Sequence, residues 1–294
     1  MSGSEKNVSV VIATLGDASL KSTVDSLNGG TLIPDEILIC IPEALACAVR
    51  DISSENTHII KTPSKGQVIQ RAIGLKKAKN ALVLQLDDDI ILSRTAIEEL
   101  CDILISKGKG NVVAPFFIRK NAESTYDTPG NFLFGIFSSI YYTTVCGASF
   151  GRKRFGTISS SGLSFSIPRK KGSKRVKETG WVPGGAALCH ASDLIVDNYY
   201  PFKGKAYCED LVHSVLWRRN GCKLWMAFDI IAEHDVTSES FIWECVVARY
   251  RAYAYVATLI DGKLWRTRLW FSIYCIRNIK TLIEQNLYYG IRRN

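Results

Sequence analysis

The sequence predicts an α/β fold with a mostly parallel central sheet flanked by helices. Three observations support this prediction. The composition, with 47% hydrophobic and 22% charged residues, is that of a globular protein. Apolar strand patterns alternate with helical patterns. The strands end in polar residues, as expected where a parallel sheet holds its ligands. The 294 residues can form one large domain or a domain with an appendage.

The first part of the chain repeats strand and helix units. Strands are expected at residues 8–13, 36–41, 58–61, 81–86 and 111–116. One helix should end near Leu27, and another should span residues 66–79 with an apolar face. A helix from Arg94 to Ser106 is expected next, with Ser93 as its N-cap.

Regular patterning stops after residue 116, where an uncharged segment precedes a basic one. The segment from Asn131 to Gly151 would just span a bilayer, but Ser, Thr and Gly dilute it, which predicts a buried or interfacial element. Between Arg152 and Lys177 there are nine basic residues and no acidic one, which equals the net charge of +9. This stretch is either an exposed loop or a surface that attracts phosphate, including that of an anionic membrane. Aromatic residues do not interleave with the basic run from Arg169 to Lys177, so we expect no nucleic-acid partner.

Regular structure is expected again in the last part of the chain. A short strand should follow Gly184-Gly185, paired glycines that mark close approach of the backbone to a ligand or a strand. A helix over 207–219 and a strand over 223–228 come next. Residues 241–291 have long helical patterns rich in aromatic residues and arginine. Such helices suit packing on the main domain, a membrane interface or a homo-oligomer contact, and the sequence leaves these alternatives open.

The nine cysteines lack any C-x-x-C pair, which indicates reduced thiols and a cytoplasmic protein, with peripheral association at the inner face of the membrane as an option. The polar stretch from Met1 to Asn7 leads straight into a strand, so we expect no signal peptide.

Three adjacent carboxylates mark the candidate site. Asp87, Asp88 and Asp89 follow a buried apolar strand, where their mutual repulsion and lost hydration call for a cation. Mg²⁺ or Mn²⁺ prefers oxygen ligands and is usually completed by substrate phosphates. The alternative is a solvated turn that caps the next helix, although Ser93 could supply that cap.

A second acidic pair and a histidine lie further along the chain. Glu209 and Asp210 occupy the first turn of a predicted helix, where the helix dipole alone would favour acids. His234 stands alone between Glu233 and Asp235, and a lone histidine is more often structural than a ligand.

In their order and spacing, these motifs resemble family 2 glycosyltransferases, which have the GT-A fold and use a nucleotide-activated sugar. The matching pieces, within about residues 7–236, are Val8 to Thr14, Gly66 to Ala78, Leu86 to Asp89, Gly184 to Ala186, Glu209-Asp210 and His234. The resemblance implies that Asp87 and Asp89 hold the metal and that Asp88 faces the donor sugar or ribose. It makes Asp210 the catalytic base, with Glu209 assisting the acceptor, and His234 an additional metal ligand. Thr14, Asp17, Arg71, Gly184 and Gly185 would belong to the nucleotide-sugar pocket.

The resemblance implies an inverting glycosyltransferase that uses Mn²⁺ or Mg²⁺. It would move a sugar from a nucleotide-sugar donor to a glycan or lipid-linked glycan acceptor, in cell-surface polysaccharide synthesis. The catalytic domain would span 1–236, with 126–179 as an insertion or acceptor-side segment, and 237–294 would form a C-terminal helical region. One departure is Cys40-Ile41-Pro42-Glu43, where many members have an acidic turn that contacts the nucleoside. The alternatives are a sugar-phosphate nucleotidyltransferase, which Thr14-Leu15-Gly16-Asp17 disfavours, and a catalytically silent, membrane-associated scaffold.

Overall fold

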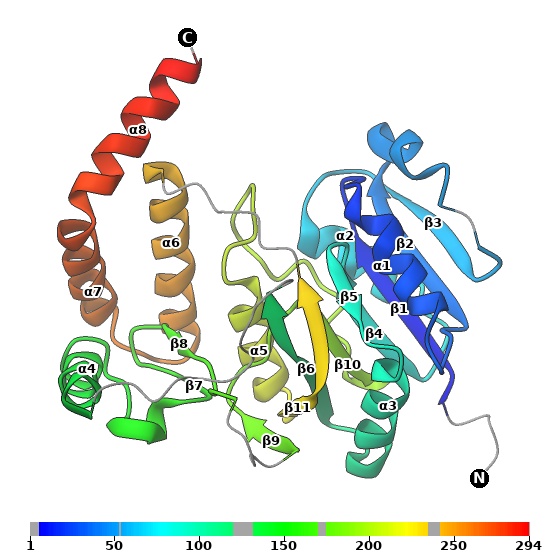
Figure 1. Ribbon diagram of the computed structural model, residues 1–294, viewed down its shortest axis with the longest axis horizontal. Helices are drawn as coiled ribbons and strands as arrows, with labels where there is room; N and C mark the ends of the chain where they lie inside the picture. Colours follow the sequence, from blue (N-terminus) through cyan, green and yellow to red (C-terminus); the bar gives the residue numbers. More distant parts are fainter. Residues whose placement is uncertain (1–5, 53, 120–131, 170–174, 235–241, 294) are drawn as a thin grey trace. The chain divides into compact units, whose positions relative to one another are not determined.

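The computed structural model of the chain describes residues 6–52, 54–119, 132–169, 175–234 and 242–293. It forms two compact units (Figure 1). Unit 1 comprises residues 1–125 and 171–235, and unit 2 comprises residues 126–170 and 236–294. The uncharged segment after residue 131 therefore groups with the C-terminal helices.

Unit 1 is built on a sheet with nine strands among the described residues. The strands are β1 (Val8–Ala13), β2 (Glu36–Pro42), β3 (Thr57–Thr62), β4 (Leu82–Asp87), β5 (Ile90–Leu92), β6 (Asn111–Arg119), β9 (Val176–Thr179), β10 (Ala186–His190) and β11 (Lys223–His234). Their order is β3-β2-β1-β4-β10-β6-β11-β5, with β9 paired to β11. The β3-β2-β1-β4 half and the β6-β11 pair are parallel, whereas β10 runs antiparallel to both its neighbours. The predicted α/β class with a mostly parallel sheet is confirmed.

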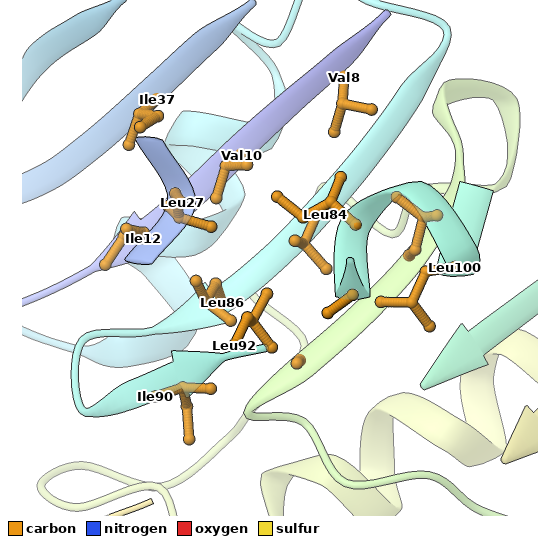
Figure 2. Packing of buried hydrophobic residues seen from close by; sticks show 14 of the residues in the cluster. Val8, Val10, Ile12, Leu27, Ile37, Leu84, Leu86, Ile90, Leu92 and Leu100 are labelled. Atoms are coloured by element: carbon orange, nitrogen blue, oxygen red, sulfur yellow. The ribbon is translucent and has the colours of Figure 1, made fainter. Parts of the chain in front are cut away.

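Helices cover both faces of this sheet. They are α1 (Ser19–Asn28), α2 (Gln67–Leu75), α3 (Ala96–Lys107) and α5 (Glu209–Arg219). On one face, side chains of β1 and β4 such as Val10 and Leu84 are fully buried against Leu27 of α1 and Leu100 of α3 (Figure 2). On the other face α2 lies very close to the sheet, because a Cβ added at Gly74 would lie 2.4 Å from Cys40 Sγ.

Several predicted boundaries differ from the structure. The predicted N-cap Ser93 is wrong: α3 begins at Ala96, and its N-cap Thr95 makes no capping hydrogen bond but donates instead to Glu99, at 2.8 Å. Helix α2 ends four residues earlier than expected. Strand β11 continues beyond residue 228 because an irregularity between Ala227 and Ile231 lets it keep pairing with β6.

Unit 2 consists of helices and a small hairpin. Its elements are α4 (Phe132–Thr144), β7 (Thr157–Ile158), β8 (Ser164–Phe165), α6 (Trp243–Leu259), α7 (Leu264–Arg277) and α8 (Ile279–Arg293). Arg266 of α7 donates to the carbonyls of Thr143 and Thr144, which satisfies the C-terminal end of α4. Gly162 packs on α6, where an added Cβ would lie 2.1 Å from the Tyr253 carbonyl oxygen. Within the described residues, no helix combines the length and apolar character needed to cross a bilayer.

The basic stretch from Arg152 to Lys177 does not form one continuous loop. Arg154 is 9% exposed and donates to the Ser139 hydroxyl inside unit 2, at 2.7 Å. Arg175 belongs to unit 1, where it pairs with Glu99 and lies 3.7 Å from Asp229. Residues 170–174 lie outside the described part of the chain.

Candidate active site

The three aspartates lie where β4 leaves the sheet, and they line two neighbouring cavities. Asp87 and Asp89 line a cavity of about 260 Å³. Asp88, between them, lines a second cavity of about 600 Å³. Gln67 and Ala206 line both cavities, so the two are adjacent. The triplet is therefore split between two spaces, with Asp87 at the end of β4 and Asp88 and Asp89 in the turn before β5.

The larger cavity contains Thr14 and Asp17, both predicted for the nucleotide-sugar pocket. Thr14 Oγ1 donates to Asp88 Oδ2 and accepts from the Gly16 amide, at 2.9 Å. The pKa of Asp17 is lowered by hydrogen bonds from Ser19. Burial, together with the charges of its two acidic neighbours, raises the pKa of Asp88 to about 6.

Arg71 was also predicted for the nucleotide-sugar pocket, and it lies in the interior of unit 1. It is 2% exposed and is not among the residues that line either cavity. Its guanidinium donates to Asp87 Oδ1 at 2.7 Å and to Glu209 Oε1 at 2.6 Å. Burial acts to lower the pKa of Arg71, but the two carboxylates outweigh it and raise the pKa. Arg71 thus fixes the end of β4 to the start of α5.

The first turn of α5 carries the second acidic pair. Cys208, the N-cap, has the left-handed φ of 54°, which costs energy for a residue other than glycine. Both oxygens of Glu209 are engaged, because Oε1 accepts from Arg71 and Oε2 accepts from the Tyr199 hydroxyl at 2.8 Å. Asp210 lines the smaller cavity. Burial and the nearby charge of Glu209 raise the pKa of Asp210 to about 7.

Gly184 and Gly185 also line the smaller cavity, and a side chain added at either position would be crowded. A Cβ added at Gly184 would lie 2.7 Å from Glu209 Oε1, and one added at Gly185 would lie 3.3 Å from Asp87 Oδ2. The Gly185 carbonyl accepts from the Asp87 amide at 2.8 Å, which holds the glycine pair beside the end of β4.

His234 ends β11 and lines the same cavity as Asp87 and Asp89. The antiparallel pairing of β11 with β5 places it opposite Ile90, next to Asp89 in the chain. Its ring lies 5.8 Å from that of Phe117, edge to face. Among the described residues, no three His, Cys, Asp or Glu side chains are grouped closely enough to hold a metal ion by themselves. Two carboxylates and an imidazole are nevertheless donor types that Mn²⁺ accepts.

Sequence reasoning missed several polar residues of the site. Gln67 donates to Asp87 Oδ1 at 2.9 Å, and Gln70 donates to the carbonyls of Thr14 and Cys40, which ties the ends of β1 and β2 together. Lys65 and Lys205 line the larger cavity. The predicted helix start at residues 65–67, shortly after a strand, could have pointed to Lys65 and both glutamines. Nothing in the local pattern pointed to Lys205.

Glu43, considered as a substitute for the missing acidic turn, does not line the larger cavity. It is exposed and lies 3.4 Å from Lys61.

The solved structures that share this fold include GalNAc-T7 and S. aureus TarS. The crystal structure of GalNAc-T7 with UDP, GalNAc and Mn²⁺ has a TM-score of 0.55 and 17% identity, over 79% of this chain and 44% of that one. The crystal structure of S. aureus TarS residues 1–349 has a TM-score of 0.53 and 13% identity, over 89% of this chain and 68% of that one. This chain therefore covers less than half of the GalNAc-T7 chain. No curated protein sequence matches it.

The sheet topology and these likenesses define a fold of the GT-A glycosyltransferase class. The family model for glycosyl transferase family 2 matches residues 9–167, more than half of the chain. The chain belongs to this family, as the sequence motifs predicted.

Proposed function

We propose that this glycosyltransferase moves a sugar, with inversion, from a nucleotide-sugar donor to a hydroxyl of a glycan or lipid-linked glycan, in the synthesis of a cell-surface polysaccharide. One observation carries the proposal. Asp210 lines the same cavity as Asp87, Asp89 and His234, beside a larger cavity suited to a nucleotide. A separate base next to a diphosphate site is what an inverting displacement requires. Because the nine cysteines are present as thiols, we place the reaction in the cytoplasm.

The larger cavity supports the donor assignment. Its volume of about 600 Å³ lies in the range typical of small-molecule sites. Lys65 and Lys205 provide positive charge for a diphosphate, whereas Asp17 and Asp88 provide acceptors for sugar or ribose hydroxyls. A UDP-sugar is the first donor to test, since UDP is bound in the structure of GalNAc-T7.

The smaller cavity suits a divalent metal. Asp87, Asp89 and His234 would hold Mn²⁺ or Mg²⁺, and the donor diphosphate would complete the coordination. Gly185 leaves open the space next to Asp87 Oδ2 that a side chain would fill, and the Asp87 side chain is 26% exposed. The bound cation would stabilise the negative charge that develops on the leaving diphosphate.

The chemistry assigns different roles to the two acids of α5. Asp210 takes the proton from the acceptor hydroxyl as that oxygen bonds to the anomeric carbon and the bond to the diphosphate oxygen breaks. A pKa of about 7 suits a base that works near neutral pH. Glu209, held by Arg71 and Tyr199, positions the helix turn that carries Asp210.

A donor panel tests the proposal directly. Purified protein is incubated with UDP-, GDP- and other nucleotide sugars, with Mn²⁺, with Mg²⁺ and with EDTA, and release of the nucleoside diphosphate is measured. We expect turnover with at least one donor and its loss with EDTA. Pyrophosphate release from a nucleoside triphosphate and a sugar phosphate would instead show a nucleotidyltransferase. If the chain binds a donor but shows no turnover with any acceptor tested, the alternative of a catalytically silent scaffold replaces the proposal.

A variant tests the assignment of the base. Asp210→Asn should abolish transfer while calorimetry still detects donor binding of similar affinity. Loss of donor binding in this variant would mean that Asp210 serves the donor instead. Asp197→Asn, which changes an exposed aspartate of the same unit, is the matched control.

A further inference from the structure

The net charge of the chain belongs entirely to unit 2. Of the 37 basic and 28 acidic residues, 14 basic and 5 acidic residues lie in unit 2, a difference of nine. Unit 1 keeps 23 of each sign and is neutral. Unit 2 therefore attracts anionic partners more strongly than the catalytic sheet does.

Exposed apolar side chains are concentrated in the same unit. Among the residues whose side chains the structure describes, thirteen large apolar ones are exposed. Ten of them belong to unit 2: Phe137, Ile140, Phe150, Trp243, Leu264, Trp265, Leu269, Ile276, Ile279 and Ile283. Single exposed apolar residues are normal on any surface, whereas their concentration on one unit indicates an interaction surface.

Helix α7 arranges part of this set in a stripe. Trp265, Leu269 and Ile276 are 54%, 40% and 70% exposed, and their spacing of four and seven residues places them on one helix face. The opposite face packs inward, where Thr267 donates to the Ser161 carbonyl at 3.0 Å and Phe271 contacts Tyr250. Helix α7 therefore exposes a row of apolar side chains on the face opposite its internal contacts.

Helix α8 follows α7 directly in the chain (Figure 1), and its first turns also expose apolar side chains. Ile279 and Ile283 are 58% and 55% exposed and lie one helical turn apart. Exposed cations accompany the stripe at Arg268, Arg277 and Lys280. The sequence of α7 contains no acid, and that of α8 contains only Glu284. We call the exposed residues of α7 together with Ile279, Lys280 and Ile283 the α7–α8 surface.

Charge decides which partner this surface fits. A second copy of the chain would bring another unit with a charge of +9 against it, which repulsion disfavours. A bilayer containing anionic lipid offers the complementary charge, together with an apolar layer below the headgroups. Tryptophan and aliphatic side chains on one face, with Lys and Arg beside them, are the composition of helices that lie in a membrane interface.

We infer that the α7–α8 surface binds the surface of an anionic lipid bilayer. Trp265, Leu269 and Ile276 enter the boundary between headgroups and acyl chains, and Arg268 and Lys280 contact lipid phosphates. This inference concerns unit 2 alone and does not depend on the transfer reaction.

Vesicle cosedimentation tests the inference. The full chain is mixed with vesicles of phosphatidylcholine alone, or with about one third phosphatidylglycerol. We expect binding to the anionic vesicles, weakened by added salt. The double variant Trp265→Ser/Ile276→Ser should lower vesicle affinity by about tenfold or more. Arg268→Gln/Lys280→Gln should lower it severalfold and reduce its salt dependence. Ile33→Ser, which changes a side chain 56% exposed in unit 1, is the control and should leave binding unchanged.

A second measurement reports contact even if the double variant folds poorly. Brominated lipids quench tryptophan fluorescence on contact, and Trp265→Phe should remove most of the quenching seen in the wild-type chain. Absence of binding to anionic vesicles, or quenching unchanged in Trp265→Phe, overturns the inference. It is also overturned if the α7–α8 variants dissociate an oligomer in light scattering without changing vesicle affinity, because the surface would then join copies of the chain.

Discussion

Replacing Arg71 by methionine should destabilise unit 1 severely. Methionine fills a similar volume but leaves Asp87 and Glu209 without the cation that now lies 2.7 and 2.6 Å from them. The Glu209 side chain is 7% exposed, so water cannot replace the lost partner. Removing one member of a buried ion pair typically costs about 3–5 kcal/mol. Spread over a unit of this size, such a loss lowers Tm by roughly 6–20 °C.

Urea unfolding followed by circular dichroism measures this loss, with Lys76→Met as the matched control, since Lys76 is an exposed cation at the end of the same helix. The double variant Arg71→Met/Glu209→Gln should recover part of the lost free energy of unfolding, because the uncompensated buried charge is removed. The reasoning fails if Arg71→Met costs less than about 1 kcal/mol, or if the same cost appears in the Glu209→Gln background.

Four further predictions concern the site. Because burial raises the pKa of Asp210 to about 7 and the base acts in its deprotonated form, kcat/KM should rise as pH increases through about 7; a flat profile between pH 5 and 9 would contradict this role. The same raised pKa means that ionised Asp210 destabilises the fold at pH values above its unfolded pKa of about 3.9. Asp210→Asn should therefore raise the free energy of unfolding at pH 8, and an unchanged urea midpoint would contradict this destabilisation. Gly184→Ala should lower the free energy of unfolding in urea by about 1–3 kcal/mol and lower kcat, because its Cβ would lie 2.7 Å from Glu209 Oε1. Gly135→Ala is the control and should cause no measurable loss, because its Cβ would meet nothing within 4 Å. At Cys208, with φ of 54°, glycine should be at least about 1 kcal/mol more stable than valine, and equal stability would show that the turn relaxes.

Much of the fold was predictable because strands and helices of unit 1 leave strong local patterns. Apolar runs such as residues 8–13 and 82–86 are buried on both faces of the sheet, and each is a strand as predicted. The antiparallel direction of β10 was not predictable, because it depends on which strands it joins rather than on its own residues.

The candidate site was predictable where residues adjoin in sequence, and less so where the fold joins distant segments. The aspartate triplet follows its strand directly, so its position was evident. The contact between Arg71 and Glu209 spans 138 residues, and no local pattern encodes it. The basic stretch from Arg152 to Lys177 looked continuous in sequence, yet burial of Arg154 and the ion pairs of Arg175 divide it between the two units.

Helix α2 contacts both halves of the site within its first two turns. Gln70 holds the ends of β1 and β2 beside the larger cavity, whereas Gln67 and Arg71 hold Asp87. Arg71 also donates to Glu209, the residue before the proposed base Asp210. An engineer who alters this helix to change donor preference would therefore also disturb the turn that carries the proposed base. Directed evolution of new donor specificity should instead vary the 203–206 loop, whose residues Gly204, Lys205 and Ala206 line the larger cavity.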